Sequence, residues 1–255
     1  NAWTDSSPLI VISGQATSNQ YSESKIRQLG NKSLNIIDIV KPLTKYAVRV
    51  ENPMKLRSIL EQAAFYAKEG RPGPVWIDIP IDIQGMVIDN RNQKKFNPPC
   101  INVNTNQLSI DVKNTLNLFR NANRPILLVG NGVRLSGAVP IFHKLVDKIN
   151  VPVLTSRRGA DIVPNNHKLY FGRPGSYGQR AANFIIQNSD LLLCIGARLS
   201  IPQIGRNYKY FARNAKKIIV DIDALELQKK TVSADIAINE DAKIFIEALL
   251  NEIIK

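Results

Sequence analysis

The second part of the chain alternates short aliphatic runs with amphipathic segments, and this alternation constrains the fold more than any other feature. Strands that alternate with helices predict a parallel sheet with helices on both faces. The expected strands are residues 125–130, 151–156, 191–199, 217–223 and 234–239, and the expected helices are 108–120, 137–150, 179–189, 205–217 and 240–255. We therefore expect a doubly wound, Rossmann-like α/β domain over residues 107–255, with a long glycine-rich loop between its second strand and third helix.

Residues 1–88 predict part of a second α/β domain. Apolar runs at 8–14, 45–50 and 71–85 predict strands, the last ending at Pro80. Residues 53–70 predict a helix with one apolar face, formed by Leu56, Ile59, Leu60, Ala63, Ala64 and Ala67. Strand 8–14 is expected to be fully buried, yet no element precedes it and Asn1 is not an initiating methionine, so we expect a fragment. Residues 89–106, rich in Asn, Lys, Gln and Pro, predict a linker.

Composition limits the class of protein. A chain of 255 residues with 44% hydrophobic content can bury a full core. No apolar stretch approaches the ~20 residues of a membrane span, and no secretory signal pattern opens the chain, so we expect a cytoplasmic protein without a membrane partner. Two cysteines, Cys100 and Cys194, support neither a disulfide framework nor a thiolate metal site. Cys194, inside an apolar run, is expected to be a core residue.

The formal net charge of +13 is high. Its densest patch is GRNYKYFARNAKK, residues 205–217, in which lysines and arginines alternate with aromatic residues. Such a mixture can stack bases and bind phosphates. Helical spacing explains it equally well as an amphipathic helix with aromatic residues facing the core. Because no RNA-binding or helix-turn-helix signature accompanies the patch, we favour the helix and expect no nucleic-acid partner.

Ligands of a doubly wound sheet bind outside the carboxyl ends of its strands. The loops expected there are 130–132, 155–159, 172–178, 196–200 and 221–223. Gly130-Asn131-Gly132 resembles a phosphate-binding turn, but Gly137 comes too late for the dinucleotide fingerprint. Arginines at positions 157, 158 and 198 suit a pyrophosphate, and Asp221 and Asp223 suit ribose hydroxyls. The alternative is that the glycines only form turns and the acids only cap helices.

Candidate catalytic side chains are few. His143 and His167 have no serine or cysteine placed as a partner, so each is expected to be a satisfied surface or loop histidine. Asp78 and Asp82 flank Pro80 at a strand end, where backbone capping is the simpler interpretation. No spacing of metal ligands is present.

Five stretches carry a resemblance to a known family: NAWTDSSPLIVISGQ, RQLGNKSLNIIDIVKPLTKYAVRV, RPGPVWIDIPIDIQ, HKLYFGRPGSYGQRAANFIIQNSDLLLCIGARL and FARNAKKIIVDIDALEL. They resemble, in order, the large subunit of acetolactate synthase and its thiamine-diphosphate-dependent relatives. The resemblance implies the second half of a pyrimidine-binding domain (1–88) followed by a central domain (107–255). The catalytic glutamate would lie upstream of Asn1 and the magnesium motif downstream of Lys255, so this chain alone is not expected to catalyse a reaction.

The resemblance also implies a reaction and a quaternary structure. Thiamine diphosphate and Mg²⁺ in the full-length enzyme would decarboxylate a 2-oxo acid such as pyruvate and pass the carbanion to an acceptor. A homodimer or tetramer is expected, because the family's active sites form between subunits.

The central domain of such enzymes holds FAD, ADP or nothing. By position, the nucleotide-contacting residues would be Gly130, Asn131, Gly132, Gly175, Tyr177, Gly178, Gly196, Arg198, Asp221, Asp223, Asp235 and Ile236. Three departures from the acetolactate synthase pattern leave substrate and nucleotide open: Ser200-Ile201 in place of an acidic pair, Asn31-Lys32-Ser33 in place of Phe-Gln-Glu, and Ile81 in place of a lysine. The alternatives are a stand-alone module that binds FAD, ADP or coenzyme A, and a basic nucleic-acid-binding protein.

Overall fold

A computed structural model describes residues 1–20, 26–89, 91–100 and 105–254. The chain divides into two compact units, Asn1–Asn102 and Val103–Lys255. This division falls within the linker expected at 89–106. Among the described residues, no helix is long and apolar enough to cross a membrane.

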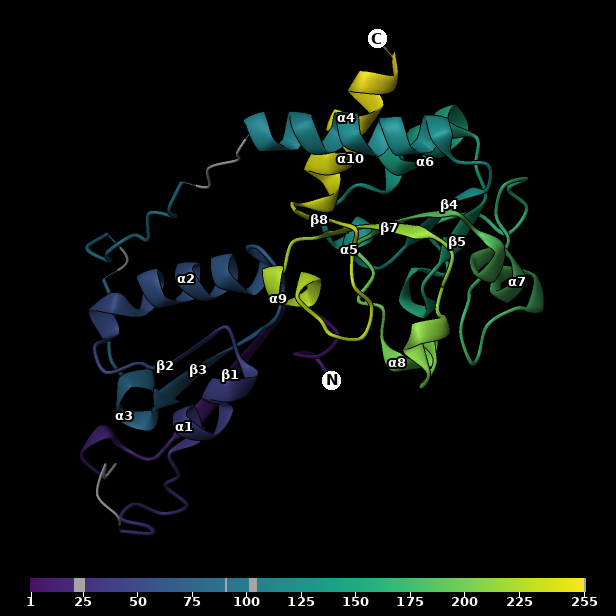
Figure 1. Ribbon diagram of the computed structural model, residues 1–255. Helices are drawn as coiled ribbons and strands as arrows, with labels where there is room; N and C mark the ends of the chain where they lie inside the picture. The colour runs from purple at the N-terminus through teal and green to yellow at the C-terminus, as the bar shows by residue number, and fades with distance from the viewer. Residues whose placement is uncertain (21–25, 90, 101–104, 255) are drawn as a thin grey trace. The chain divides into compact units, whose positions relative to one another are not determined.

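The first unit is a three-stranded parallel sheet covered by helices (Figure 1). Its strand order is β1-β3-β2, and helix α2 packs against all three strands. The elements are β1 (Leu9–Gln15), η1 (Ser18–Gln20), α1 (Ile36–Val40), η2 (Lys41–Leu43), β2 (Tyr46–Arg49), η3 (Pro53–Lys55), α2 (Leu56–Lys68), β3 (Pro74–Pro80) and α3 (Ile81–Gln84). The expected end of the last strand at Pro80 is confirmed.

Burial in this unit differs from the sequence pattern in two places. On α2, Ile59, Ala63 and Ala67 are buried as expected, but Leu60 and Ala64 are exposed. The expectation that the first strand is fully buried is wrong, since Ile10 is 44% and Ile12 59% exposed. β1 lies at the edge of the sheet, beside β3, and Ile10 and Ile12 share one face of the strand, which their exposure shows to be open to solvent.

Part of the expected linker packs on α2. The side-chain oxygen of Gln93 accepts the backbone N–H of Arg57 at 3.2 Å, and its amide nitrogen donates to the carbonyl of Pro53 at 3.1 Å. The backbone N–H of Phe96 donates to a carboxylate oxygen of Glu61 at 2.7 Å. This bond, aided by Arg57, lowers the pKa of Glu61 below its ordinary value. Gln93 and Phe96, in the first part of the expected linker, are therefore held by hydrogen bonds to η3 and α2.

The second unit contains a five-stranded parallel sheet in the order β5-β4-β6-β7-β8. Its elements are α4 (Thr105–Asn121), β4 (Pro125–Val129), α5 (Gly132–Leu135), α6 (Val139–Ile149), β5 (Val153–Thr155), η4 (Arg157–Gly159), α7 (Arg180–Asn188), β6 (Leu191–Ile195), α8 (Ile201–Ile204), η5 (Tyr208–Tyr210), β7 (Lys216–Asp221), α9 (Ala224–Leu227), β8 (Ile236–Asn239) and α10 (Ala242–Ile254). The expected doubly wound α/β sheet is confirmed.

A short extended segment inside the expected glycine-rich loop continues this sheet beyond β5. Tyr170 forms a parallel bridge with Val153, and the N–H of Phe171 donates to the carbonyl of Val153 at 3.1 Å. The N–H of Thr155 donates to the carbonyl of Gly172 at 3.0 Å. With this segment counted as the third strand along the chain, the spatial order becomes 3-2-1-4-5-6, which is common in doubly wound folds. Successive strands are therefore added on one side of β4 and then, from β6 onward, on its other side, while all strands stay parallel.

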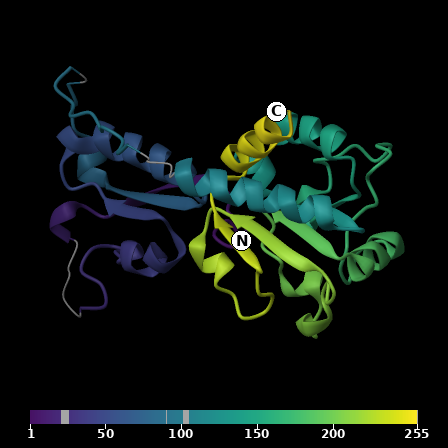
Figure 2. The same cartoon turned by 45° about the horizontal axis from the view of Figure 1, so that its top comes forward.

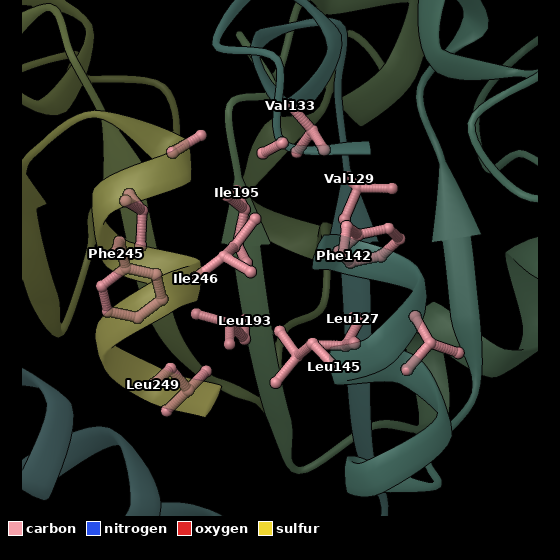
Figure 3. Packing of buried hydrophobic residues seen from close by; sticks show 14 of the residues in the cluster. Leu127, Val129, Val133, Phe142, Leu145, Leu193, Ile195, Phe245, Ile246 and Leu249 are labelled. Carbon is pink, nitrogen blue, oxygen red and sulfur yellow. The ribbon is translucent and has the colours of Figure 1, made fainter. Parts of the chain in front are cut away.

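Helices cover both faces of the sheet. Helices α4, α6 and α10 lie on one face, and α7, α8 and α9 lie on the other (Figures 1 and 2). Phe142 of α6 and Phe245 of α10 are fully buried on the first face. Figure 3 shows both rings beside aliphatic side chains of β4 and β6, among them Leu127 and Ile195. Continuous apolar runs in these strands follow from burial on both faces.

The expected amphipathic helix over residues 205–217 does not form. The segment contains the short helix η5 followed by turns, and Lys216 already begins β7. Left-handed backbone at Gly205 (φ 83°) and Ala212 (φ 43°) interrupts any continuous helix. Phe211 is buried while Tyr210 is 57% exposed, so the aromatic residues do not share one face.

Candidate functional site

The glycine turn after β4 packs directly on the end of β6. A Cβ atom at Gly130 would lie 2.2 Å from the carbonyl oxygen of Gly196, and one at Gly132 would lie 2.7 Å from the Cα of Gly196. The N–H of Gly130 donates to the carbonyl of Ile195 at 2.9 Å, and that of Gly132 to the carbonyl of Gly196 at 3.0 Å. Both N–H groups are therefore already bonded to backbone carbonyls of the protein and do not point to a phosphate-binding role. A ligand at this turn would have to be held by other groups, such as those of Asn131.

The end of β6 also differs from the expected strand 191–199. Gly196 adopts a left-handed backbone with φ of 58°, which ends the strand at Ile195. Its N–H donates to the carbonyl of Val220 at 2.9 Å, so it ties β6 to β7. Arg198, two residues on, is exposed at this edge of the sheet.

The loop 172–178 is held by its own hydrogen bonds and by α8. The N–H of Gly175 donates to the side chain of Asn183 at 2.8 Å, and the N–H of Gly178 donates to the carbonyl of Gly175 at 3.0 Å. A Cβ at Gly175 would lie 2.6 Å from the carbonyl of Pro202. Tyr177 is 78% exposed, and the guanidinium of Arg157 lies 5.8 Å from its ring centre. The loop thus presents an aromatic face and a cation.

Asp221 ends β7 and Asp223 follows it, and Asp223 takes the helix-capping role that the sequence left open. A side-chain oxygen of Asp223 accepts the N–H of Leu225 at 3.0 Å and caps α9. A side-chain oxygen of Asp221 accepts the N–H of Asp223 at 3.0 Å. A carboxylate can accept several hydrogen bonds, so these contacts do not by themselves exclude a ribose hydroxyl.

Asp235 and Ile236 do not lie with these residues, and the expectation that they share the site is corrected by the strand register. Ile236 pairs with Ile218 at the amino ends of β8 and β7. A side-chain oxygen of Asp235 accepts the N–H of Lys217 at 2.7 Å. In a parallel sheet the amino and carboxyl ends of the strands lie at opposite edges. The two residues therefore lie at the opposite edge of the sheet from Gly196 and Asp221.

Two cations that sequence reasoning missed lie at the carboxyl edge. Arg134 of α5 donates to Asn131 at 2.6 Å and to the carbonyl of Arg158 at 2.9 Å, and it pairs with Asp161. The ammonium of Lys229 donates to the carbonyl of Arg198 at 2.8 Å. The position of Arg134, two residues after Gly132, could have indicated from the sequence that it lies near the glycine turn. Lys229 is placed here by the chain fold after α9.

Comparison with known proteins assigns the family. A family model described as thiamine pyrophosphate enzyme, central domain, matches residues 112–249, more than half of the chain. The chain belongs to this thiamine pyrophosphate enzyme family. The matched residues lie in the second unit, which carries the carboxyl-edge loops.

The chain matches curated relatives across both of its units. It is 33% identical over 99% of its length to a probable acetolactate synthase large subunit of Methanococcus aeolicus, covering 41% of that protein. It is 34% identical over 99% of its length to the corresponding protein of Methanocaldococcus jannaschii, covering 42% of that protein. It is 30% identical over 98% of its length to the acetolactate synthase large subunit of Lactococcus lactis, again covering 42% of that protein. The chain thus spans about two fifths of the length of these curated relatives.

Both histidines of the chain have partners within the fold, as expected. A ring nitrogen of His143 lies 2.6 Å from the carbonyl of Ile162. His167 accepts the N–H of Leu169 at 3.2 Å and lies 3.6 Å from Asp147. Within the described ranges, no group of three or more His, Cys, Asp or Glu side chains is arranged to hold a metal ion.

The two cysteines are expected to react very differently with a thiol reagent. Burial raises the pKa of Cys194, and the charge of Asp221 raises it further, so this thiol stays protonated at neutral pH. Cys100 is exposed. We expect an aromatic disulfide reagent to label Cys100 within minutes and Cys194 only after unfolding. Mass spectrometry of digested, labelled protein measures this, and fast labelling of Cys194 in the folded chain would contradict the buried position of β6.

Proposed function

We propose that this chain is part of a thiamine-diphosphate-dependent enzyme that decarboxylates a 2-oxo acid and joins the product to an acceptor, as acetolactate synthase does. The observation that carries the proposal is identity of 33% over 99% of the chain to an acetolactate synthase large subunit, since it extends over both units. Thiamine diphosphate with Mg²⁺ supplies the carbanion chemistry when bound. The residues of this chain would position substrate and stabilise the subunit.

The substrate belongs to the class of small 2-oxo acids, and three positions bear on its identity. Ile81, where acetolactate synthases carry a lysine, is 60% exposed at the start of α3. Ser200 and Ile201, in place of an acidic pair, begin α8, and Ile201 is 45% exposed. Replacing a cation by an apolar side chain changes how an anionic substrate is held. An acceptor or 2-oxo acid other than pyruvate is therefore as consistent with this chain as acetolactate synthesis.

The assay for this proposal is 2-oxo acid consumption by the natural protein that contains the chain. We expect turnover of pyruvate or a related 2-oxo acid that requires both thiamine diphosphate and Mg²⁺ and that yields a carboligation product. Omission of thiamine diphosphate is the control. No cofactor-dependent turnover across a panel of 2-oxo acids would contradict the proposal.

We propose further that the second unit binds a nucleotide, FAD or ADP, in a structural role at the carboxyl ends of β6 and β7. The support is the exposed guanidinium of Arg198, the carboxylates of Asp221 and Asp223, and the ring of Tyr177. Guanidinium groups suit pyrophosphate, carboxylates suit ribose hydroxyls, and an exposed aromatic ring suits a flat base. The glycine turn contributes close packing rather than phosphate-binding N–H groups.

Nucleotide binding is expected to raise the melting temperature of the chain. At a nucleotide concentration about 100 times Kd, the rise should be roughly 5–10 °C for a unit of this size. Arg198→Gln should remove most of the shift, whereas Arg213→Gln, which alters an exposed arginine just before β7, should not. FAD, ADP and coenzyme A are tested separately. No shift with any of them, or equal loss in both variants, would contradict this site.

Assembly and compartment follow from the same proposal. We propose a homodimer or tetramer in the cytoplasm, because thiamine-dependent active sites of this family form between subunits. No nucleic-acid partner is proposed, since the basic segment 205–217 has its aromatic residues divided between core and surface.

A further inference from the structure

A cavity of about 480 Å³ opens beside the carboxyl end of β5, within the second unit. Its walls come from the segment after η4, which includes Asp161, Val163 and Asn165, and from Tyr170, Arg173 and Gln179. The volume falls within the range of about 300–1,000 Å³ typical of small-molecule sites. None of these residues is among the glycine, Arg198 or aspartate positions of the nucleotide site proposed above.

The cavity carries positive charge. Arg173 is partly buried and makes no ion pair with any residue in the described part of the chain. The acid in the lining, Asp161, is already paired with Arg134. A partly buried guanidinium without a carboxylate partner favours an anionic ligand, because an ion pair gains strength where water is excluded.

The remaining polar lining adds hydrogen-bond donors. The side-chain oxygen of Gln179 accepts the N–H of Arg173 at 2.8 Å, so the amide group of Gln179 offers its NH₂ to the cavity. The N–H of Gln179 donates in turn to the carbonyl of Arg173 at 2.9 Å. Gly172 permits this arrangement, since a Cβ there would lie 2.8 Å from the side-chain oxygen of Gln179. These bonds hold the side-chain amide of Gln179 and the backbone of Arg173 in place before any ligand arrives.

Part of the cavity lining is apolar. Val163 is 2% exposed, and Ala160 and Pro164 continue the wall. The hydroxyl of Tyr170 lies 3.0 Å from the hydroxyl of Thr155, so the ring is held in place. A ligand with an anionic end and a compact apolar or flat body matches this mixed lining.

We propose that this cavity is a binding site for a small anionic molecule, with Arg173 holding its phosphate or carboxylate group and Gln179 donating a second hydrogen bond. The proposal does not depend on thiamine chemistry, because ligand and test concern the second unit alone. Phosphate and carboxylate share the chemistry that a guanidinium fork recognises. The experiment must separate them.

Calorimetric titration of the chain with inorganic phosphate and with pyruvate tests the proposal. We expect at least one probe to bind. Arg173→Gln should weaken that Kd by about tenfold or more, since a charge-assisted hydrogen bond is lost. Arg173→Lys keeps the charge and should retain part of the affinity. Binding of phosphate alone identifies a phosphate site, and binding of pyruvate alone identifies a carboxylate site.

Two control variants keep the result interpretable. Arg180 lies on the next helix with its guanidinium 5.3 Å from the Phe184 ring centre, so Arg180→Gln removes an equal charge outside the cavity. Arg213→Gln removes the charge of an exposed arginine just before β7, also outside the cavity. Both should leave the Kd for phosphate or pyruvate within about twofold. The proposal is overturned if neither probe binds, if Arg173→Gln binds like the unaltered chain, or if Arg180→Gln loses as much affinity.

Discussion

Replacing Gly130 with alanine is expected to lower the free energy of unfolding of the second unit by about 3 kcal/mol or more, which lowers its melting temperature by roughly 6–12 °C. The added Cβ would lie 2.2 Å from the carbonyl oxygen of Gly196 and 2.4 Å from the Cα of Ala197. Both are backbone atoms, so no flexible side chain can move aside. Relief requires β4 and β6 to separate, which breaks the hydrogen bond from Gly130 to Ile195.

Two other glycines supply the comparison for this change. Gly137 has φ of 73° with no atom within 4 Å of a built Cβ, so Gly137→Ala should cost only the left-handed backbone penalty of about 1–2 kcal/mol. Gly85 has φ of −84° and nearest atoms at 3.8 Å, so Gly85→Ala should be neutral within about 1 kcal/mol. Scanning calorimetry measures all three. Equal melting temperatures for the Gly130 and Gly85 variants would contradict the close packing of the turn after β4 on the end of β6.

Replacing Asp78 with alanine is expected to destabilise the first unit by about 3–5 kcal/mol, the usual effect of removing one partner of a buried ion pair. Asp78 is fully buried in β3. Its carboxylate accepts Nε of Arg49 from β2 at 3.2 Å and the hydroxyl of Ser13 from β1 at 2.7 Å. The carboxylate therefore joins all three strands. The variant leaves a guanidinium that is 11% exposed without this partner.

Tryptophan fluorescence measures this change directly. The indole N–H of Trp76 donates to the hydroxyl of Ser13 at 2.8 Å, and the other tryptophan, Trp3, also belongs to the first unit. Urea unfolding followed by this signal should shift strongly for Asp78→Ala. Arg57→Ala is the control, since its pair with Glu61 is partly exposed and worth less than about 1 kcal/mol. A double replacement of Arg49 and Asp78 by leucine should recover part of the loss. Similar midpoints for the Asp78 and Arg57 variants would contradict the network.

The sequence could predict those parts of the candidate site that follow from the parallel direction of the strands. Once strands 125–130, 191–199 and 217–223 are parallel, their following residues must gather at one edge, and Gly130, Gly196 and Asp221 do so. Asp235 directly precedes β8 and Ile236 begins it, and the amino ends of parallel strands lie at the other edge of the sheet. The sequence could not predict that the N–H groups of Gly130 and Gly132 donate to the carbonyls of Ile195 and Gly196, because these partners lie more than 60 residues away along the chain.

Local sequence pattern by itself determined the alternation of strands and helices, the parallel sheet of the second unit and the ends of β3 and β4. These features depend on apolar periodicity, proline and glycine within a few residues. Tertiary structure alone decided the exposure of β1, the extension of the sheet by the segment around Tyr170 and the turns that replace a helix over residues 205–217. It also decided the Asp78 network and the cavity at Arg173. Each of these results from contacts between segments distant along the chain, whose free energy outweighs local propensity.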